Sequence, residues 1–288
     1  MLACLMAVFS INDILLASDG LASNNTAPVP CIKPKVSESI SSSVLYLPIA
    51  DALVKAIPIR ECQEKVIDLL EVKEPRLKPR SAVDTSYCPA YEGYSRVRLG
   101  VYRRLVSMLR YLPKDIGIAY SEGFRPFSKQ KEYFDAIFKD FLHKTKDGKE
   151  AYGEAAKLVS PFIDNKPTHC TGAAIDMALF RIKDDSNLEV LDMGLYDSSK
   201  DNDNETFTTS ITEIQKENRL LLLKSATKAG LVNYGYEWWH YSYGDRAWAY
   251  AKGEKYAIYD LVVDKSDPIL MITKESYLAE ASLHTDTK

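Results

Sequence analysis

The sequence predicts a mixed α+β fold in which amphipathic helices alternate with short apolar strands. Residues 97–112 place apolar side chains on one side of a helix, and residues 213–229 form another helix that Gly230 closes. Between them, residues 116–120 and 173–180 are apolar runs of strand length. With 288 residues, 46% of them hydrophobic, the chain can bury the core of one domain or at most two.

The remaining segments complete this outline. A helix is expected over residues 129–142, with Ser128 as its N-cap, and a further strand around residues 257–263. Residues 71–80 are charged and contain prolines, so they predict a surface connection. Residues 38–70 mix short apolar runs without a clean period, and the sequence leaves their fold open.

Charge and hydropathy exclude two classes of partner. The formal net charge is -3, and acidic and basic residues are interspersed, so no basic surface is expected to follow a nucleic-acid backbone. No apolar run approaches the roughly 20 residues that cross a bilayer, so no stable membrane span is expected. The oligomeric state is not defined by the sequence.

The five cysteines are spread along the chain without a Cys-x-x-Cys pair, which disfavours a thiolate zinc site. Removal of an N-terminal signal would leave four of them, which could pair in an oxidising compartment. Scattered buried thiols are the simpler interpretation. Cys170 is accordingly expected to be a small buried side chain and not a soft metal ligand.

Two of the four histidines, His169 and His240, lie among aromatic, glycine and acidic residues. Asp176 lies within an apolar strand, where an ionised carboxylate requires a cation or a strong hydrogen-bond partner. A catalytic zinc takes three nitrogen or oxygen ligands and keeps one position for water. We therefore predict one zinc ion per chain on His169, Asp176 and His240. Gly172 allows the backbone to turn between the first two ligands.

Each of these residues, taken alone, has a simpler interpretation. A histidine beside tryptophans is more often packed in a core than bound to a metal, and Asp176 can pair with an arginine or with backbone amides. His143, at the end of a helix, and His284, in a polar tail, are assigned to such structural roles. The three candidates together favour the metal site.

Two further residues extend the predicted site. Glu237 lies three residues before His240 and is the expected general base, which takes a proton from water and returns it to a leaving amine. Residues three apart on a straight strand face opposite sides, so irregular backbone is expected between them.

Arg125 follows the strand at residues 116–120. It is either a surface or capping arginine or a guanidinium that stabilises an oxyanion.

The chain carries three short motifs in this order: Gly123-Phe124-Arg125-Pro126, His169-x-x-Gly-x-Ala-x-Asp176 and Glu237-Trp238-Trp239-His240. These motifs resemble those of the zinc D-alanyl-D-alanine dipeptidases, which include the vancomycin-resistance dipeptidases. The resemblance covers approximately residues 87–250. It implies a compact α+β domain with a central antiparallel sheet, a fold related to the hedgehog signalling domain.

The resemblance also implies roles for the same residues: zinc ligation by His169, Asp176 and His240, acid/base catalysis by Glu237, and stabilisation of the tetrahedral intermediate by Arg125. It implies a small dipeptide of D-amino acids as the substrate, cleaved in a small closed pocket in peptidoglycan metabolism. A D,D-carboxypeptidase or peptidoglycan endopeptidase is the alternative within this class. A non-catalytic zinc-binding module is the alternative from another class, and the presence of both the glutamate and the arginine argues against it.

The sequence departs from this family at two places. The family usually carries serine two residues before the first histidine, where Pro167 stands here, and the adjacent Thr168 is the expected substitute hydrogen-bond donor. The segment after Gly194 is also one residue shorter before Asp197. Both departures bear on the identity of the substrate more than on metal binding.

The resemblance and the N-terminal composition together predict the organisation of the chain. We expect a signal-like segment and linker, a zinc peptidase domain and a C-terminal tail at residues 1–35, 36–265 and 266–288. Residues 2–11 form an apolar stretch of signal-peptide length, although no basic residues precede it. Export to the periplasm of a bacterium is therefore expected, with a cytoplasmic location as the alternative.

Overall fold

The computed structural model describes residues 43–184, 187–194, 201–263 and 268–283. The expected signal-like segment and linker at residues 1–35 lie outside this part of the chain, as does His284. Among the helices of the described ranges, none has the length and apolar character needed to cross a bilayer.

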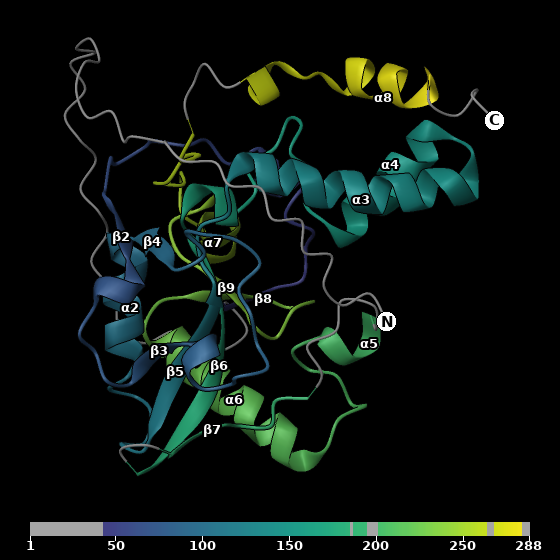
Figure 1. Ribbon diagram of the computed structural model, residues 1–288. Helices are drawn as coiled ribbons and strands as arrows, with labels where there is room; N and C mark the ends of the chain where they lie inside the picture. Colours follow the sequence, from purple (N-terminus) through teal and green to yellow (C-terminus); the bar gives the residue numbers. More distant parts are fainter. Residues whose placement is uncertain (1–42, 185–186, 195–200, 264–267, 284–288) are drawn as a thin grey trace.

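A mixed sheet of seven strands lies at the centre of the fold (Figure 1). From one edge to the other its order is β1 (Val44–Leu45), β8 (Val232–Tyr234), β9 (His240–Ser242), β6 (Ala174–Asp184), β5 (Ile116–Glu122) and β3 (Leu77–Pro79), and β7 (Asn187–Val190) also pairs with β6. The central pairings are antiparallel, as expected, whereas β1 and β3 run parallel to their neighbours. Residues 71–80 were expected to form a surface connection. This prediction is wrong for the part that forms β3, because Leu77 is buried and pairs with Ile118.

Helices and a small second sheet surround these strands. The helices are α1 (Ala52–Lys55), α2 (Leu99–Met108), α3 (Phe127–Thr145), α4 (Gly148–Leu158), α5 (Asp201–Asn204), α6 (Glu213–Lys228), α7 (Arg246–Lys252) and α8 (Lys274–Leu283). Short 3₁₀ turns are η2 (Leu69–Glu71), η3 (Arg80–Ala82), η4 (His169–Thr171) and η5 (Pro268–Met271). The second sheet pairs β2 (Val66–Asp68) with β4 (Arg96–Arg98).

Some predicted helix limits are confirmed and others are wrong. The α6 helix agrees with the prediction, and Gly230 follows it with a φ of +87°. The predicted helix at residues 97–112 is shorter, because its first residues pair with β2 as strand β4. Ser128 is not an N-cap, since α3 has already begun at Phe127, directly after Pro126.

The strand predicted around residues 257–263 is also wrong. Within these described residues, Ala257 forms only an isolated bridge with Ile59. Ile258 and Tyr259 are nevertheless completely buried. The apolar character of this segment therefore reflects packing of an irregular chain in the core.

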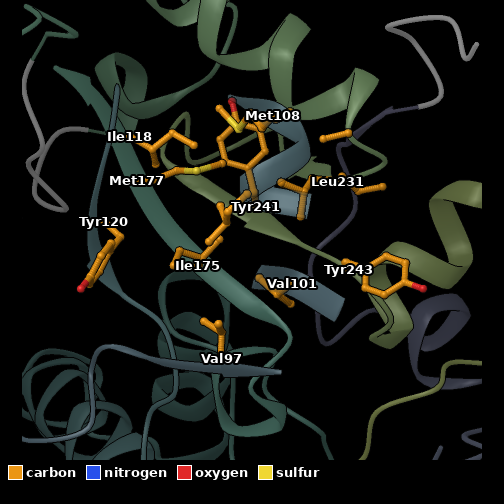
Figure 2. Close-up of a cluster of buried hydrophobic side chains, with 14 of the residues drawn as sticks. Val97, Val101, Met108, Ile118, Tyr120, Ile175, Met177, Leu231, Tyr241 and Tyr243 are labelled. Carbon is orange, nitrogen blue, oxygen red and sulfur yellow. The ribbon is translucent and has the colours of Figure 1, made fainter. Parts of the chain in front are cut away.

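Strand alternation places the apolar core on one face of the sheet. Ile175 and Met177 of β6 belong to the same buried cluster as Met108 of α2 (Figure 2). Leu222 of α6 is also a member of this cluster. Because successive side chains of a strand point to opposite faces, Asp176 points away from this cluster. The same alternation that builds the core thus presents a carboxylate on the other face.

A second, smaller core joins α3, α4 and α8, which lie together above the sheet in Figure 1. Its buried side chains are mainly aromatic: Phe127, Phe134, Phe138, Tyr152, Phe162 and Tyr277. Cys170 also belongs to it, and burial raises the pKa of its thiol to about 12. Cys170 is thus a small buried side chain, as predicted.

The close packing after β5 gives a first testable prediction. A Cβ atom on Gly123 would lie 2.4 Å from the carbonyl oxygen of Arg96 and 2.8 Å from a methyl carbon of Val97. We expect Gly123→Ala to lower the free energy of unfolding by about 1–3 kcal/mol, the usual cost of overpacking. Gly153→Ala is the control, because its Cβ meets nothing within 4 Å and alanine favours α4 by about 0.5–1 kcal/mol. Urea denaturation measures both, and equal midpoints would contradict the prediction.

Candidate metal centre

The register of the sheet places three acidic and basic side chains in one row. Asp176 of β6 lies directly opposite His240 of β9 on one side and Glu122 of β5 on the other. Residues directly opposite in antiparallel strands share a face of the sheet. A β-bulge between Tyr120 and Glu122 shifts the register and brings Glu122 opposite Asp176.

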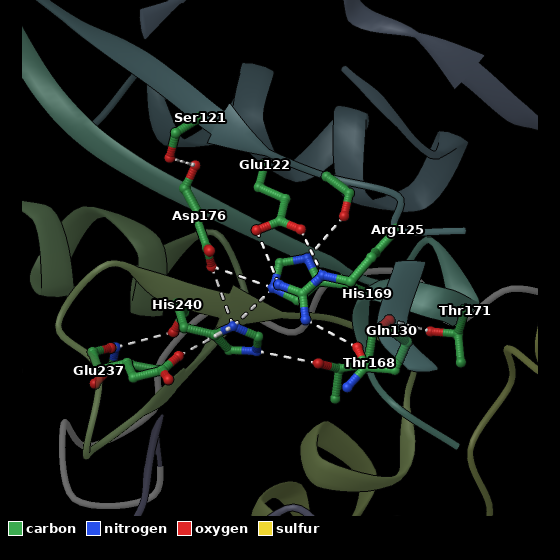
Figure 3. A network of polar contacts seen from close by, with 12 residues as sticks. Ser121, Glu122, Arg125, Gln130, Thr168, His169, Thr171, Asp176, Glu237 and His240 are labelled. Atoms are coloured by element: carbon green, nitrogen blue, oxygen red, sulfur yellow. Dashed lines mark hydrogen bonds and ion pairs between the residues drawn. The ribbon is translucent and has the colours of Figure 1, made fainter. Parts of the chain in front are cut away.

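His169 joins Asp176 and His240 from the η4 turn. The Nε2 atom of His169 lies 3.4 Å from Oδ1 of Asp176, and Nδ1 of His240 lies 3.1 Å from the same oxygen. The two imidazole nitrogens are 3.1 Å apart (Figure 3). A tetrahedral zinc ion with bonds of about 2.0–2.1 Å separates its ligand atoms by about 3.3 Å. The three predicted ligands, all buried, therefore have the mutual spacing that one zinc ion requires.

The outer nitrogens of both imidazoles have protein partners. Nδ1 of His169 donates to the carbonyl oxygen of Gly123 at 2.7 Å, and Nε2 of His240 lies 3.2 Å from the hydroxyl of Thr168. Such outer contacts fix the tautomer and ring orientation of metal-binding histidines. With a proton on each outer nitrogen, the inner nitrogens of His169 and His240 present lone pairs beside Asp176.

The electrostatics of the cluster favour a positive charge beside Asp176. Burial acts to raise the pKa of Asp176, but the imidazoles of His169 and His240, when they are protonated, lower it well below its usual range. Burial acts to lower the pKa of His240, yet Asp176 raises it. The arginine that could have paired with Asp176, Arg125, forms its salt bridge with Glu122. Two imidazoles, one carboxylate and a preference for positive charge fit a divalent cation.

Glu237 lies in the turn between β8 and β9, beside the cluster. Its Oε2 atom is 3.7 Å from Nδ1 of His240, and its side chain is 33% exposed, compared with 5% for His240. The amide of His240 donates to the carbonyl oxygen of Glu237 at 3.1 Å, so this backbone is a turn, as expected. Burial raises the pKa of Glu237, and the proximity of His240 partly offsets that rise.

Arg125 follows β5 and is only 15% exposed, so it is not a surface arginine. Its amide donates to the carbonyl oxygen of His169 at 3.2 Å, which ties the two motifs together. Its guanidinium bonds to Glu122 and to Gln130 of α3, and its carbon lies 5.0 Å from the ring centre of Tyr133. The three motifs of the sequence thus converge on one site.

Sequence reasoning missed Glu122 and Tyr91, whose hydroxyl donates to Glu122. One signal for Glu122 was available, since a carboxylate ends an otherwise apolar strand three residues before Arg125. Tyr91 gave no signal, because it lies in an irregular segment. His143, near the end of α3, is exposed and does not belong to the cluster of predicted ligands, as expected.

The geometry of the cluster defines the class of site to which it belongs. Two imidazoles and one carboxylate around a single position, with a second carboxylate alongside, form the donor set of a mononuclear catalytic zinc site. Residues 117–260, half of the chain, match the family model described as D-ala-D-ala dipeptidase. The chain belongs to this family of metallopeptidases, whose members act as D-Ala-D-Ala dipeptidases or carboxypeptidases in peptidoglycan metabolism.

The chain is also similar to individual proteins. A D-alanyl-D-alanine dipeptidase from Synechocystis sp. is 28% identical over 232 residues, which is 70% of this chain and 90% of that protein. Among solved structures, a zinc complex of a mutant vancomycin-resistance D,D-pentapeptidase VanY is 15% identical, with 60% and 89% of the two chains covered and a TM-score of 0.33. The LD-carboxypeptidase LdcB is 16% identical, with 57% and 69% covered and a TM-score of 0.35.

The ligand set predicts the metal content of variants. His240→Ala removes one of the three predicted ligands, so we expect zinc affinity to fall by more than about 100-fold, beyond the usual effect of losing an outer contact. His143→Ala is the control and should bind zinc like the parent protein. Zinc measured by atomic absorption after dialysis tests both, and retention of zinc by His240→Ala would refute the ligand set.

The outer contact of His240 can be tested separately. Thr168→Val keeps the size of the side chain but removes the hydroxyl that faces Nε2 of His240. We expect zinc affinity to fall by about 10–100-fold, because the imidazole loses its orienting partner. Competition with a chromogenic chelator measures the change, and an unaltered affinity would show that Thr168 does not orient the ligand.

Proposed function

We propose that this chain is a zinc-dependent dipeptidase that hydrolyses D-Ala-D-Ala, with His169, Asp176 and His240 holding one zinc ion. The observation that carries the proposal is the carboxylate of Glu237 beside a buried cluster with zinc-like spacing. A bound zinc ion would polarise the scissile carbonyl and lower the pKa of water towards about 7. Export to the bacterial periplasm is part of the proposal.

Glu237 is the proposed general base of this reaction. Its carboxylate stands 3.7 Å from a ligand nitrogen without belonging to the ligand set, so it is free to accept a proton from the attacking water. It then returns the proton to the amine of the departing D-alanine. Its partial exposure allows the carboxylate to exchange protons with solvent between turnovers.

Arg125 is the proposed electrostatic partner of the developing oxyanion. Its guanidinium is bonded to Glu122, which lies directly opposite Asp176 and so shares a face of the sheet with it (Figure 3). N–H donors held rigidly in a buried site stabilise negative charge much better than mobile donors in water. Arg125 therefore supplies donors that need no rearrangement during the reaction.

Two observations favour a free dipeptide over a longer substrate. The three ligand side chains are only 4–6% exposed, which restricts access to the metal position. The matched relative that this chain covers almost throughout is a dipeptidase. The hydroxyl of Thr168, the expected substitute for the family's serine, contacts His240.

Hydrolysis of free D-Ala-D-Ala by the purified full chain tests the proposal, with a chelator and with zinc restored. We expect chelator-sensitive release of D-alanine. The comparison substrate is a cell-wall pentapeptide that ends in D-Ala-D-Ala. Faster release from the pentapeptide would identify a carboxypeptidase, and cleavage within cross-linked peptides an endopeptidase. Bound zinc without cleavage of any of these would favour a binding module.

The role of Glu237 has its own prediction. Glu237→Gln removes the base but keeps the shape of the side chain, so we expect kcat to fall by about 10²–10⁴-fold with zinc content unchanged. Glu189→Gln is the control, because Glu189 pairs with Lys183 on the exposed surface and should leave kcat unaltered. Full activity of Glu237→Gln would exclude Glu237 as the base.

A further inference from the structure

Glu122 was not among the predicted site residues. Its carboxylate accepts two hydrogen bonds from the guanidinium of Arg125. Nε of Arg125 donates to Oε1 of Glu122 at 2.6 Å, and Nη2 donates to Oε2 at 2.9 Å. Both side chains are 15% exposed, so the pair is largely shielded from water. Paired parallel hydrogen bonds of this kind fix the plane of a guanidinium as well as its position.

Further hydrogen bonds hold the Glu122–Arg125 pair in position. Nη1 of Arg125 donates to the amide oxygen of Gln130 at 2.8 Å, and Gln130 in turn donates to the carbonyl oxygen of Ser160. The hydroxyl of Tyr91 donates to the same Glu122 oxygen that receives Nε of Arg125. Each partner comes from a different segment of the chain, so the arrangement requires the fold.

The bonding leaves a defined set of donors for substrate. A guanidinium has five N–H groups, and Glu122 and Gln130 take three of them. A substrate oxygen would be bound by the other two, one on each terminal nitrogen. The orientation of those two N–H groups is set by the bonds that Glu122 makes.

Glu122 is not itself suited to bind the metal. The potential ligand atoms that cluster within 4.8 Å of one another belong to His169, Asp176 and His240. Glu122 lies opposite Asp176 in the sheet, and two adjacent carboxylates repel each other unless each has a cationic partner. The guanidinium provides that partner for Glu122.

We propose that Glu122, held by Tyr91, is a positioning residue that aims Arg125 at the oxyanion. This inference rests on the proposed role of Arg125. Tyr91 lies outside residues 117–260, so the segment before the matched region supplies part of the device. The competing interpretation is a salt bridge that only stabilises the fold.

The test compares kcat and KM for D-Ala-D-Ala in a double-mutant cycle of Glu122→Gln and Arg125→Ala. Positioning predicts that Glu122→Gln lowers kcat by about 10²-fold, as small misplacements do, with KM and zinc content nearly unchanged. In the Arg125→Ala background the same change should have little further effect on kcat. Additive losses in the cycle, or an unchanged kcat in Glu122→Gln, would overturn the inference.

Failure of the underlying proposal is distinguishable in the same cycle. If Arg125→Ala alone keeps full kcat, the proposed oxyanion role is wrong and the inference fails with it. If Arg125→Ala loses kcat while Glu122→Gln does not, only the positioning role is wrong.

A milder pair of variants covers the case in which Glu122→Gln does not fold. Tyr91→Phe removes one hydroxyl and keeps the ion pair, and we expect kcat to fall several-fold without a change in KM. Tyr259→Phe is the matched control, because it removes an equivalent tyrosine bond to Glu64. Equal losses of thermal stability in both variants with unchanged kcat would leave Tyr91 with a structural role only and would overturn the inference.

Discussion

The burial of Asp176 within the central sheet is the constraint on which the rest of the site depends. An ionised carboxylate in such a position costs several kcal/mol unless positive charge or hydrogen-bond donors surround it. The register places Glu122 on one side of Asp176 and His240 on the other. Each carboxylate of this row has its own basic partner: Arg125 for Glu122, and the imidazoles of His169 and His240 for Asp176.

The candidate metal ligands could be recognised in the sequence because they interrupt local patterns. Asp176 is conspicuous as a charge within an apolar strand, and strand alternation then predicts that it leaves the core face. Composition and spacing also predicted two turns. One lies at Gly172, which has a φ of +69°, and the other at Glu237. These are features of short contiguous segments, for which local physical chemistry is sufficient.

The parts that could not be predicted depend on contacts between distant segments. Strands β3 and β4 contain three residues each, too few for an alternating pattern to emerge. Their existence follows from pairing with β5 and β2, which no local window contains. The contact of Tyr91 with Glu122 could not be predicted for the same reason, because it joins residues that are 31 apart in the chain. Burial of Ile258 without a strand shows that an apolar run alone does not define its backbone.

The turn after β5 joins fold and site so closely that neither can change alone. The carbonyl oxygen of Gly123 accepts the proton of His169 Nδ1, so a backbone atom determines which nitrogen of His169 faces the metal position. His240 depends instead on a side chain, the hydroxyl of Thr168, which substitution can remove without moving the backbone. Arg125 lies in the same turn, two residues after Gly123. A shift of this turn would therefore change the orientations of the His169 imidazole and the Arg125 guanidinium together. The close packing of Gly123 against Arg96 and Val97 thus supports the geometry of the site as well as the stability of the fold.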